Sequence, residues 1–476
     1  MTPARDSVLC VDLDGSLVAT DLLAESLLLL IKRNPLYAVM IPLWLVRGPA
    51  RFKREVARRV QLDAAVLPYN GGVLAWLREE HGRGRALVLA TASDRLLASR
   101  VALHLGVFSD VHASDGDINL KGAAKAARLV DRYGRRGFSY VGNSRADLAV
   151  WRDADSAVIV GDGDTLAAQV DAGTPIIRRF DAVARAPAHA LLRAMRPHQW
   201  AKNLLLFVPL VTSHQLASVA ATGAAMRAFA AMCLASAAIY IVNDLLDLEA
   251  DRAHSSKRAR PFASGEAPIL HGVLLAPALV LAALAIAASL PREFVGWLAA
   301  YLLATLAYSL RLKHVAILDV LVLALLYTLR LIAGAAAIAV TFSAWLLAFS
   351  VFFFLSLALL KRFSEIDTAW RRDGPQESVR GYRAGDRDAV GQFGTASGYL
   401  SILVMALYTN SRDVVALYAN PVWLWGFCPL LLYWVSRIWL VAYRGEMHDD
   451  PILYAVKHPS SYVVVAGLGA CMYLAI

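Results

Sequence analysis

The two halves of the chain differ in how their apolar residues are arranged. Up to about Arg193, short apolar runs alternate with charged residues, whereas long apolar stretches such as Gly272–Leu290 and Ala316–Val340 follow. A helix needs about 20 apolar residues to cross a bilayer, so the pattern predicts about nine membrane-spanning helices. Their approximate limits are 202–217, 226–245, 270–290, 293–310, 316–340, 343–361, 394–411, 421–443 and 461–476.

The first half has the pattern of an α/β domain. Three short apolar runs, Val8–Val11, Ala86–Ala90 and Phe138–Val141, are separated by stretches of helical character. Strands that alternate with helices predict a doubly wound, Rossmann-like parallel sheet. We therefore expect a multidomain protein with an α/β domain at residues 1–185 and an all-α membrane bundle at residues 186–476.

A small helical cap is expected at about residues 20–70, between the first two strands. The cap contains the apolar run Leu36–Val46. Two interpretations of this run are open, since it either forms the core of the cap or rests against the bilayer. The core interpretation is favoured.

Composition and charge agree with a membrane bundle. Hydrophobic residues make up 58% of the chain and charged residues 18%, which is too apolar for an ordinary soluble protein. If the α/β domain is cytoplasmic and the spans alternate, basic residues gather in the inner loops, as at Arg252–Arg260 and Arg311–Lys313. Topology and phosphate binding then explain the net charge of +10, and we expect no nucleic-acid partner. The four cysteines have no paired spacing, so neither a disulfide nor a zinc site is predicted.

Polar residues stand at the ends of the three predicted strands. The first strand ends in Asp12-Leu13-Asp14, the second in Thr91, and the third precedes Gly142–Asp147, with Lys121 between the last two. Ligands of α/β sheets bind beyond the carboxyl ends of the strands. In this order the four motifs resemble the haloacid dehalogenase superfamily of phosphatases, over roughly residues 7–175.

That resemblance implies a role for each residue. Asp12 would be the nucleophile, Asp14 the general acid and base, and Thr91 and Lys121 would hold the phosphate. Mg²⁺ would be bound by Asp12, Asp14, Asn143 and Asp147. The superfamily often has an acid where this chain has Asn143, which offers an oxygen without charge. A phosphatase fold that has lost its activity is therefore the alternative.

An acidic stripe followed by a basic cluster stands at the end of the second predicted span. Asp244, Asp247 and Asp251 fall on one helical face, and such like charges at the end of a span are costly unless a cation lies between them. Mg²⁺ prefers a few carboxylates together with phosphate oxygens, so the stripe predicts a metal–diphosphate site. The neighbouring polar residues are candidates for substrate contacts: Asn243, His254, Lys257, Arg258 and Arg260.

A second group of ionisable residues surrounds the fourth to sixth predicted spans. Asp319 and Arg330 share one stripe of a membrane helix, and charges inside a membrane are functional candidates. About three turns separate them, which makes direct pairing unfavourable. We add to the candidate substrate-binding residues the following: Lys202, Asn203, Tyr308, Lys313, Asp319, Arg330, Lys361 and Arg362.

These motifs together resemble the UbiA superfamily of membrane transferases over residues 193–476. The pattern from Asn243 to Pro261, with Arg196–Asn203 and Tyr308–His314, is more similar to the decaprenyl-phosphate phosphoribosyltransferase branch. The resemblance implies transfer of 5-phosphoribose from phosphoribosyl diphosphate (PRPP) to a polyprenyl phosphate, for a cell-wall arabinan precursor, with catalytic Asp244, Asp247 and Asp251 and with Mg²⁺ as cofactor. An aromatic prenyltransferase that uses a polyprenyl diphosphate is the alternative.

The two resemblances together predict successive reactions. The transfer product would carry a 5-phosphate monoester, which a phosphatase of the haloacid dehalogenase type could remove to leave polyprenyl-phosphoryl-ribose. The expected location is a bacterial inner membrane, with both sites on its cytoplasmic side. A transporter or scaffold whose Asp and Arg form an ion path is less favoured, since no paired repeats are present.

Overall fold

The computed structural model describes residues 7–161, 163–183, 187–341, 343–373, 381–447, 451, 454 and 458–476. The chain forms two compact units. The head unit comprises Met1–Pro197 and Tyr240–Ala278, and the bundle unit comprises His198–Ile239 and Leu279–Ile476. The head unit therefore includes, besides the α/β domain, the segment that carries the acidic stripe.

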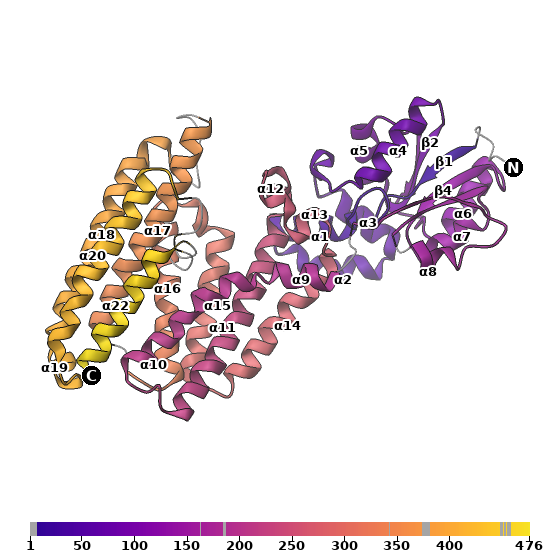
Figure 1. Ribbon diagram of the computed structural model, residues 1–476. Coiled ribbons are helices and arrows are strands. Elements are labelled where there is room, and N and C mark those ends of the chain that lie inside the picture. Colours follow the sequence, from indigo (N-terminus) through magenta and orange to yellow (C-terminus); the bar gives the residue numbers. More distant parts are fainter. Residues whose placement is uncertain are drawn as a thin grey trace. The chain divides into compact units, whose positions relative to one another are not determined.

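A six-stranded parallel sheet lies at the centre of the head unit (Figure 1). Its strand order is β3-β2-β1-β4-β5-β6, and the order reverses between β1 and β4, where the carboxyl ends of the strands leave a crevice. This confirms the predicted parallel sheet. The strands are β1 (Val8–Val11), β2 (Leu87–Asp94), β3 (Asp110–Ser114), β4 (Phe138–Gly142), β5 (Ser156–Val160) and β6 (Ile176–Phe180).

Alternating side chains of the strands form two apolar clusters, one on each face of the sheet. Leu9 and Val11 of β1 belong to the same cluster as Leu97, whereas Cys10 belongs to the cluster that contains Trp151. Burial on both faces accounts for the continuous apolar strand sequences, as parallel sheets require. The covering helices are α4 (Gly71–Gly82) and α5 (Arg95–Leu105) on one face, and α6 (Ala123–Tyr133) and α7 (Leu148–Trp151) on the other.

Three helices and a short 3-10 turn form the cap between β1 and α4. They are α1 (Leu22–Arg33), α2 (Tyr37–Val46), α3 (Pro49–Ala57) and η1 (Ala64–Val66). The favoured expectation that Leu36–Val46 forms the core of the cap is wrong. Trp44 is buried, but Val39 and Val46 are 71% and 88% exposed. The run is apolar on nearly all sides of the helix. So small a cap has too few neighbouring residues to bury every side.

Seven helices among the described residues are long and apolar enough to cross a membrane, so the chain is a multi-pass membrane protein. The spans are Val219–Leu246 (α11), Ile269–Ala287 (α14), Arg292–Leu310 (α15), Leu318–Ala337 (α16), Ala344–Arg371 in α17 (Ala344–Asp373), Ala384–Thr409 with α18 (Arg387–Thr409), and Pro421–Tyr443 with α20 (Phe427–Tyr443).

The first and last predicted spans do not meet this criterion. Residues 202–217 form part of a 3-10 helix, η3 (Pro197–Phe207), and the short helix α10 (Val208–Thr212). The last segment forms α22 (Pro459–Ala475), which has 17 residues. At 1.5 Å per residue its length is about 25 Å, which is at the lower limit for a helix that crosses a hydrocarbon core. Apolarity predicted where these segments lie in the sequence but not how far they continue as α-helix.

Glycines allow close packing inside the bundle unit. A Cβ atom on Gly394 of α18 would lie 2.2 Å from the ring of Trp439, and one on Gly398 would lie 2.6 Å from Val435. Small residues at such points let helix backbones approach closely in membrane proteins. The small size of these two glycines therefore allows the close contact between α18 and α20.

Candidate functional site

A buried network of charges lies at the carboxyl ends of β1 and β4. Asp12 follows β1, and its Oδ1 accepts a hydrogen bond of 2.7 Å from Lys125 Nζ. The same ammonium donates to the Tyr140 hydroxyl at 2.6 Å and lies 3.6 Å from Asp147 Oδ1. The strand ends thus bring Asp12 and Asp147 together around one cation.

Lys125, and not Lys121, is the lysine at this position. Lys121 is exposed, whereas Lys125 is 3% exposed on the inner face of α6. The two lysines are four residues apart, Lys121 before α6 and Lys125 within it, and sequence reasoning chose the first of them. The signal that identifies Lys125 is its position in the apolar stripe of α6, next to Ala126 and one turn before Leu129.

Burial and the lysine act in opposite directions on Asp12. Burial raises the pKa of Asp12 to about 7, although the Lys125 charge works to lower it. Burial alone would lower the pKa of Lys125, but the carboxylates of Asp12 and Asp147 together raise it. The pair therefore keeps Lys125 charged and makes the ionisation of Asp12 depend on it.

Asp14 connects the strand ends to the cap. Its Oδ1 accepts a hydrogen bond of 2.8 Å from the backbone N–H of Leu22, the first residue of α1, and its Oδ2 accepts one of 2.6 Å from Ser93 Oγ. Thr91 Oγ1 lies 3.5 Å from Oδ2. Burial, followed by the nearby charge of Asp21, raises the pKa of Asp14 to about 6. A carboxyl group that is easily protonated suits a general acid.

A second cap contact comes from Lys53 of α3, which sequence reasoning missed. Its Nζ donates to the Ala92 carbonyl at 2.6 Å and to Asn119 Oδ1 at 2.8 Å. Burial lowers the pKa of Lys53, and the charge of Asp14 acts in the opposite direction. No local motif marks this residue, because it lies far from the strand-end motifs in sequence.

Asp147 holds the loop after β4. Its Oδ2 accepts hydrogen bonds from the backbone N–H groups of Asn143 and Ser144, and from Ser144 Oγ at 2.7 Å. Asn143 packs against Gly15, which has φ +77°, and a Cβ there would lie 2.0 Å from the Asn143 amide nitrogen. Oxygen ligands suited to Mg²⁺ remain in Asp12, Asp14 and Asn143.

The acidic stripe is held by arginines from both sides in sequence. Asp244 Oδ1 accepts hydrogen bonds from Arg196 at 2.5 Å and from Arg260 at 3.2 Å, and Arg260 also donates to Asp251 Oδ2 at 2.6 Å. Helix α11 ends at Leu246, and α12 (Leu248–Ala253) starts after Asp247. Arg260 thereby links two of the three predicted acids. Asp247 is half-buried at the junction of the two helices.

Arg196 was quoted within a motif but not chosen as a site residue. It has φ +53°, which is uncommon for a residue other than glycine, and its guanidinium lies 5.2 Å from the centroid of the Tyr240 ring. A strained backbone of this kind persists only when its surroundings hold it. Its ion pair with Asp244 is such a constraint, and it places Arg196 in the candidate site.

One oxygen of the stripe has no hydrogen-bond partner among the described residues. Asp244 Oδ2 is buried, and an unsatisfied carboxylate oxygen in such a place is costly. The described part of the chain holds no group of three or more acidic, His or Cys side chains arranged to hold a metal ion. A few carboxylates with an open ligand atom fit Mg²⁺ that completes its coordination with substrate oxygens.

The remaining polar candidates of this segment surround the stripe. His254 ends α12, and its Nδ1 accepts from the Ser256 N–H at 3.3 Å. Lys257 and Arg258 lie in the 3-10 turn η4 (Lys257–Ala259), half-buried and exposed respectively, and Asn243 is half-buried near the end of α11.

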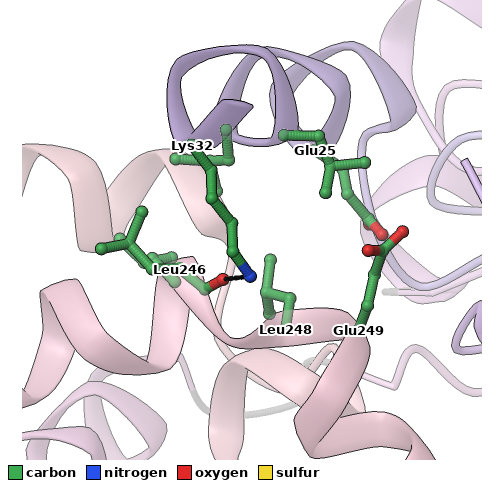
Figure 2. Close-up of a pocket in the computed structure, with 8 residues that line it drawn as sticks. Glu25, Lys32, Leu246, Leu248 and Glu249 are labelled. Carbon is green, nitrogen blue, oxygen red and sulfur yellow. Dashed lines mark hydrogen bonds between the residues drawn. The ribbon is translucent and has the colours of Figure 1, made fainter. Parts of the chain in front are cut away.

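Within the head unit, the acidic segment is bound to the cap by a buried ion pair. Arg252 of α12 donates to both carboxylate oxygens of Glu25 in α1, at 2.5 and 3.1 Å, and to the Ala263 carbonyl of α13 (Pro261–Ser264) at 3.0 Å. Figure 2 shows a second contact, the 2.6 Å hydrogen bond from Lys32 Nζ to the Leu246 carbonyl. Neither contact has a sequence signal, because the partners are more than 200 residues apart.

The carboxylates of Glu25 and Glu249 face each other beside these contacts (Figure 2). Burial, followed by the nearby Glu25 charge, raises the pKa of Glu249. The Lys32 charge acts in the opposite direction on Glu249, and Arg252 pairs with Glu25, so two cations offset the crowded acidic pair.

In the bundle unit, Asp319 and Arg330 belong to separate networks. Asp319 is fully buried, pairs with Arg362, and accepts a hydrogen bond of 2.6 Å from the Tyr382 hydroxyl. Tyr382 OH in turn accepts from the backbone N–H of Ile317, a residue with φ +67°. A fully buried ion pair at this point is a structural element as well as a candidate for substrate contact.

Arg330 is a buried cation whose hydrogen-bond partners are neutral. It donates to Asn203 Oδ1 at 2.9 Å, to the Tyr301 hydroxyl at 2.9 Å and to the Leu326 carbonyl at 2.6 Å. Lys202 lies 5.9 Å from the Tyr327 ring centroid. Tyr308, Lys313 and Lys361 are half-buried. The Arg330 charge is thus oriented by neutral groups, which suits an anion site.

Residues 206–457 match the UbiA prenyltransferase family, which is more than half of the chain. The chain belongs to this family. The UbiA match includes the acidic stripe, Asp319, Arg330 and Arg362. It leaves out the α/β domain and Arg196.

Three relatives extend the comparison. The protein y4nM of Sinorhizobium fredii is 37% identical over 99% of this chain and 91% of its own length. Nodulation protein NoeC of Azorhizobium caulinodans is 35% identical over 60% of this chain and 92% of its own length. A decaprenyl-phosphate phosphoribosyltransferase of Mycolicibacterium smegmatis is 36% identical over 47% of this chain and 71% of its own length. The first match shows that another chain combines the α/β region with a UbiA region.

We predict that the Glu25–Arg252 ion pair stabilises the folded protein, whereas either charge without its partner destabilises it. Its side chains are 2% and 4% exposed, and removal of one partner from such a pair costs about 3–5 kcal/mol because a buried charge is left. Glu25→Leu and Arg252→Leu should each lower the thermal midpoint of the purified protein, and the double variant should lose less than the sum. Arg179→Leu, which removes an exposed ion pair, should leave the midpoint unchanged. Strictly additive losses would contradict the prediction.

Proposed function

We propose that this protein transfers 5-phosphoribose from PRPP to the phosphate of a polyprenyl lipid. The observation that carries the proposal is the open oxygen of Asp244, which lies in a cluster that also holds Arg196, Arg260 and Asp251. Such a cluster combines metal-ligating oxygens with cations that can pair with phosphates. The similarity to a decaprenyl-phosphate phosphoribosyltransferase supports the same substrates.

The acidic stripe would handle the leaving diphosphate. Asp244, Asp247 and Asp251 would hold Mg²⁺, which when bound would offset the charge of the diphosphate. Arg260 and Arg196 would exchange part of their pairing with Asp244 for diphosphate oxygens. An acceptor phosphate oxygen then forms a bond to ribose C1 as the bond from C1 to the diphosphate oxygen breaks. The products are polyprenyl-phosphoryl-ribose 5-phosphate and diphosphate.

Further cations would bind the remaining phosphates. PRPP carries a 5-phosphate in addition to its diphosphate, and the acceptor is itself a phosphate. We assign Lys257 and Arg258, together with Lys313 and Arg330, to these groups. The neutral partners of Arg330 support its assignment, since no carboxylate among the described residues pairs with its charge. An aromatic prenyltransferase has fewer anionic groups to bind.

We infer that the head is a phosphatase of the haloacid dehalogenase type that removes the 5-phosphate of this product. Support comes from the parallel sheet, from the Asp12–Lys125 pair at the strand ends and from the raised pKa of Asp14. An Asp12 oxygen would attack phosphorus while the bond from phosphorus to O5 breaks, and Asp14 would give O5 its proton. Water would then attack the aspartyl-phosphate, lose a proton to Asp14 and release inorganic phosphate.

Both reactions are proposed to occur on the cytoplasmic side of a bacterial inner membrane. The basic loops predicted from the sequence support this orientation, because positive residues are retained on that side. A shared side lets the lipid product pass from one site to the other within the same chain.

We expect Asp244→Asn to abolish transfer. Purified protein with Mg²⁺, polyprenyl phosphate and labelled PRPP should produce labelled lipid, and the variant should lose about 10²–10³-fold in rate, as loss of one transition-state contact does. Glu266→Gln is the control, because the ion pair of this acid is with Arg193, outside the cluster. No label transfer, with turnover of a prenyl diphosphate and an aromatic acceptor instead, would replace the proposal with the aromatic prenyltransferase.

The head gives a prediction about pH. Asp12 reacts as the carboxylate, so phosphatase activity should rise as the pH increases through its pKa of about 7. Because Lys125 lowers that pKa, Lys125→Met should move this rise to higher pH by about one unit or more. The matched variant Lys121→Met changes an exposed lysine and should not move it. The measurement is the pH–rate profile with p-nitrophenyl phosphate, because its nitrophenolate group leaves without a proton from Asp14, whose pKa of about 6 would otherwise make the rate fall over the same range. A shift with Lys121→Met instead would return the role to Lys121.

A further inference from the structure

A cavity of about 590 Å³ opens beside the candidate phosphatase site of the head unit. The polar part of its lining, the polar end, includes Asp14, Gly15 and Asn143, which lie at the strand ends. The apolar part, the apolar end, includes Leu27 of α1 and Leu270, at the start of α14. Cavities of about 300–1,000 Å³ hold ligands much larger than a phosphate.

The apolar end of this cavity is formed by a membrane helix. Ile269 is the first residue of α14, which is one of the seven candidate spans, and Leu270 is 61% exposed. Gly265, just before α14, has φ +83°, and a Cβ there would lie 2.7 Å from Ala19 of the head. The wall of the cavity therefore depends on a close approach between the loop before the span and the strand-end loop.

We propose that this cavity binds a lipid-anchored phosphate monoester and delivers it to Asp12 and Asp14. The phosphate and its sugar would occupy the polar end, and the lipid would leave past Leu27 and Leu270 toward the bilayer. The proposal rests on the phosphatase activity inferred above and adds the site at which its lipid substrate binds. A soluble sugar phosphate makes no use of the apolar end and is a poor substrate.

The test compares two esters on the full-length protein in detergent. The substrates are polyprenyl-phosphoryl-ribose 5-phosphate and free ribose 5-phosphate, and the quantity is the ratio of their kcat/KM values for phosphate release. Leu27→Trp fills the apolar end, and Leu270→Glu adds charge there at an exposed position. Each should lower the ratio at least tenfold. Leu103→Trp, at an exposed leucine of α5, is the control and should keep the ratio.

The outcomes separate the two proposals. Equal kcat/KM for both esters, or a ratio that neither cavity variant changes, overturns the lipid site and leaves the phosphatase in place. Absence of phosphate release from any ester, with Asp12→Asn indistinguishable from the parent protein, overturns the phosphatase and the lipid site with it.

A different observation concerns helix α2, whose outer face is apolar. Tyr37, Ile41 and Trp44 pack against the core of the head. The opposite side carries Leu36, Val39, Met40, Leu43 and Val46, all of them exposed. The helix thus has a core-facing stripe and a second apolar stripe, which no described segment covers.

The neighbours of α2 indicate what covers the second stripe. Lys32, near the end of α1, donates to the carbonyl of Leu246, the last residue of the membrane helix α11. The chain therefore starts α2 shortly after it has touched the end of a span. Exposed basic side chains flank the helix at Arg33, Arg47 and Arg51. An apolar helix face bordered by basic residues is typical of insertion into the bilayer interface.

The geometry points to α2 as a helix that inserts its outer face into the lipid surface. The test places the photo-crosslinking residue p-benzoylphenylalanine at Val46 or at Leu103, which are 88% and 86% exposed, in the full-length protein in vesicles. Illumination should crosslink acyl chains at position 46 and not at position 103. A second probe at Leu43 guards against a local effect at Val46. Absence of lipid crosslinks at both α2 positions, or equal crosslinking at position 103, overturns the insertion.

Discussion

A buried carboxylate at the end of a membrane helix is the constraint around which the acidic segment is organised. Asp244 is 2% exposed, and an uncompensated charge there would be strongly destabilising. Arg196 comes to it from before α11 through a strained backbone, and Arg260 comes from the loop after α12. The electrostatic requirement of one residue therefore determines the course of the chain on both sides of it.

The head has the same arrangement with a different cation. Asp12 follows a buried strand, and Lys125 reaches it from a later helix, as Arg260 reaches Asp244 from a later loop. In both places a cation keeps an acid in place at a position where a phosphate can compete for that cation. The two candidate sites thus have a common electrostatic basis, although a parallel sheet carries one and a membrane helix carries the other.

Local patterns in the sequence were sufficient for the sheet and for the acids at its strand ends. Apolar runs with the length of strands were enough to identify the residues at their ends, Asp12, Asp14, Thr91 and Asn143. The end of a predicted span likewise identified Asp244. Lys125 was missed because two lysines four residues apart are equally good candidates until the start of the helix and its inner face are known. The packing of α2 was misjudged, because an apolar run does not say whether its partner is protein or lipid. Among the described residues seven helices are long and apolar enough to cross a membrane, where about nine were expected, since apolarity does not fix where a helix ends.

Contacts between distant parts of the sequence could not be predicted. Glu25 reads as an ordinary helix residue and Arg252 as one of several loop cations, and only the fold shows that they form a buried pair. Lys53 is similar, since nothing near it in sequence marks it as a neighbour of Asn119. In each case the partners are far apart along the chain, so no local sequence pattern indicates their contact.

Helix α1 touches Asp14 through its first N–H and the acidic segment through Glu25 and Lys32. This has an evolutionary consequence. If the head were inherited as a separate polypeptide, Glu25 would lose its counter-ion and Lys32 its acceptor, so both positions would come under pressure to change. Free-standing relatives of the head should therefore carry a neutral residue in place of Glu25, and the acid at this position should be a mark of chains in which the two regions stayed joined.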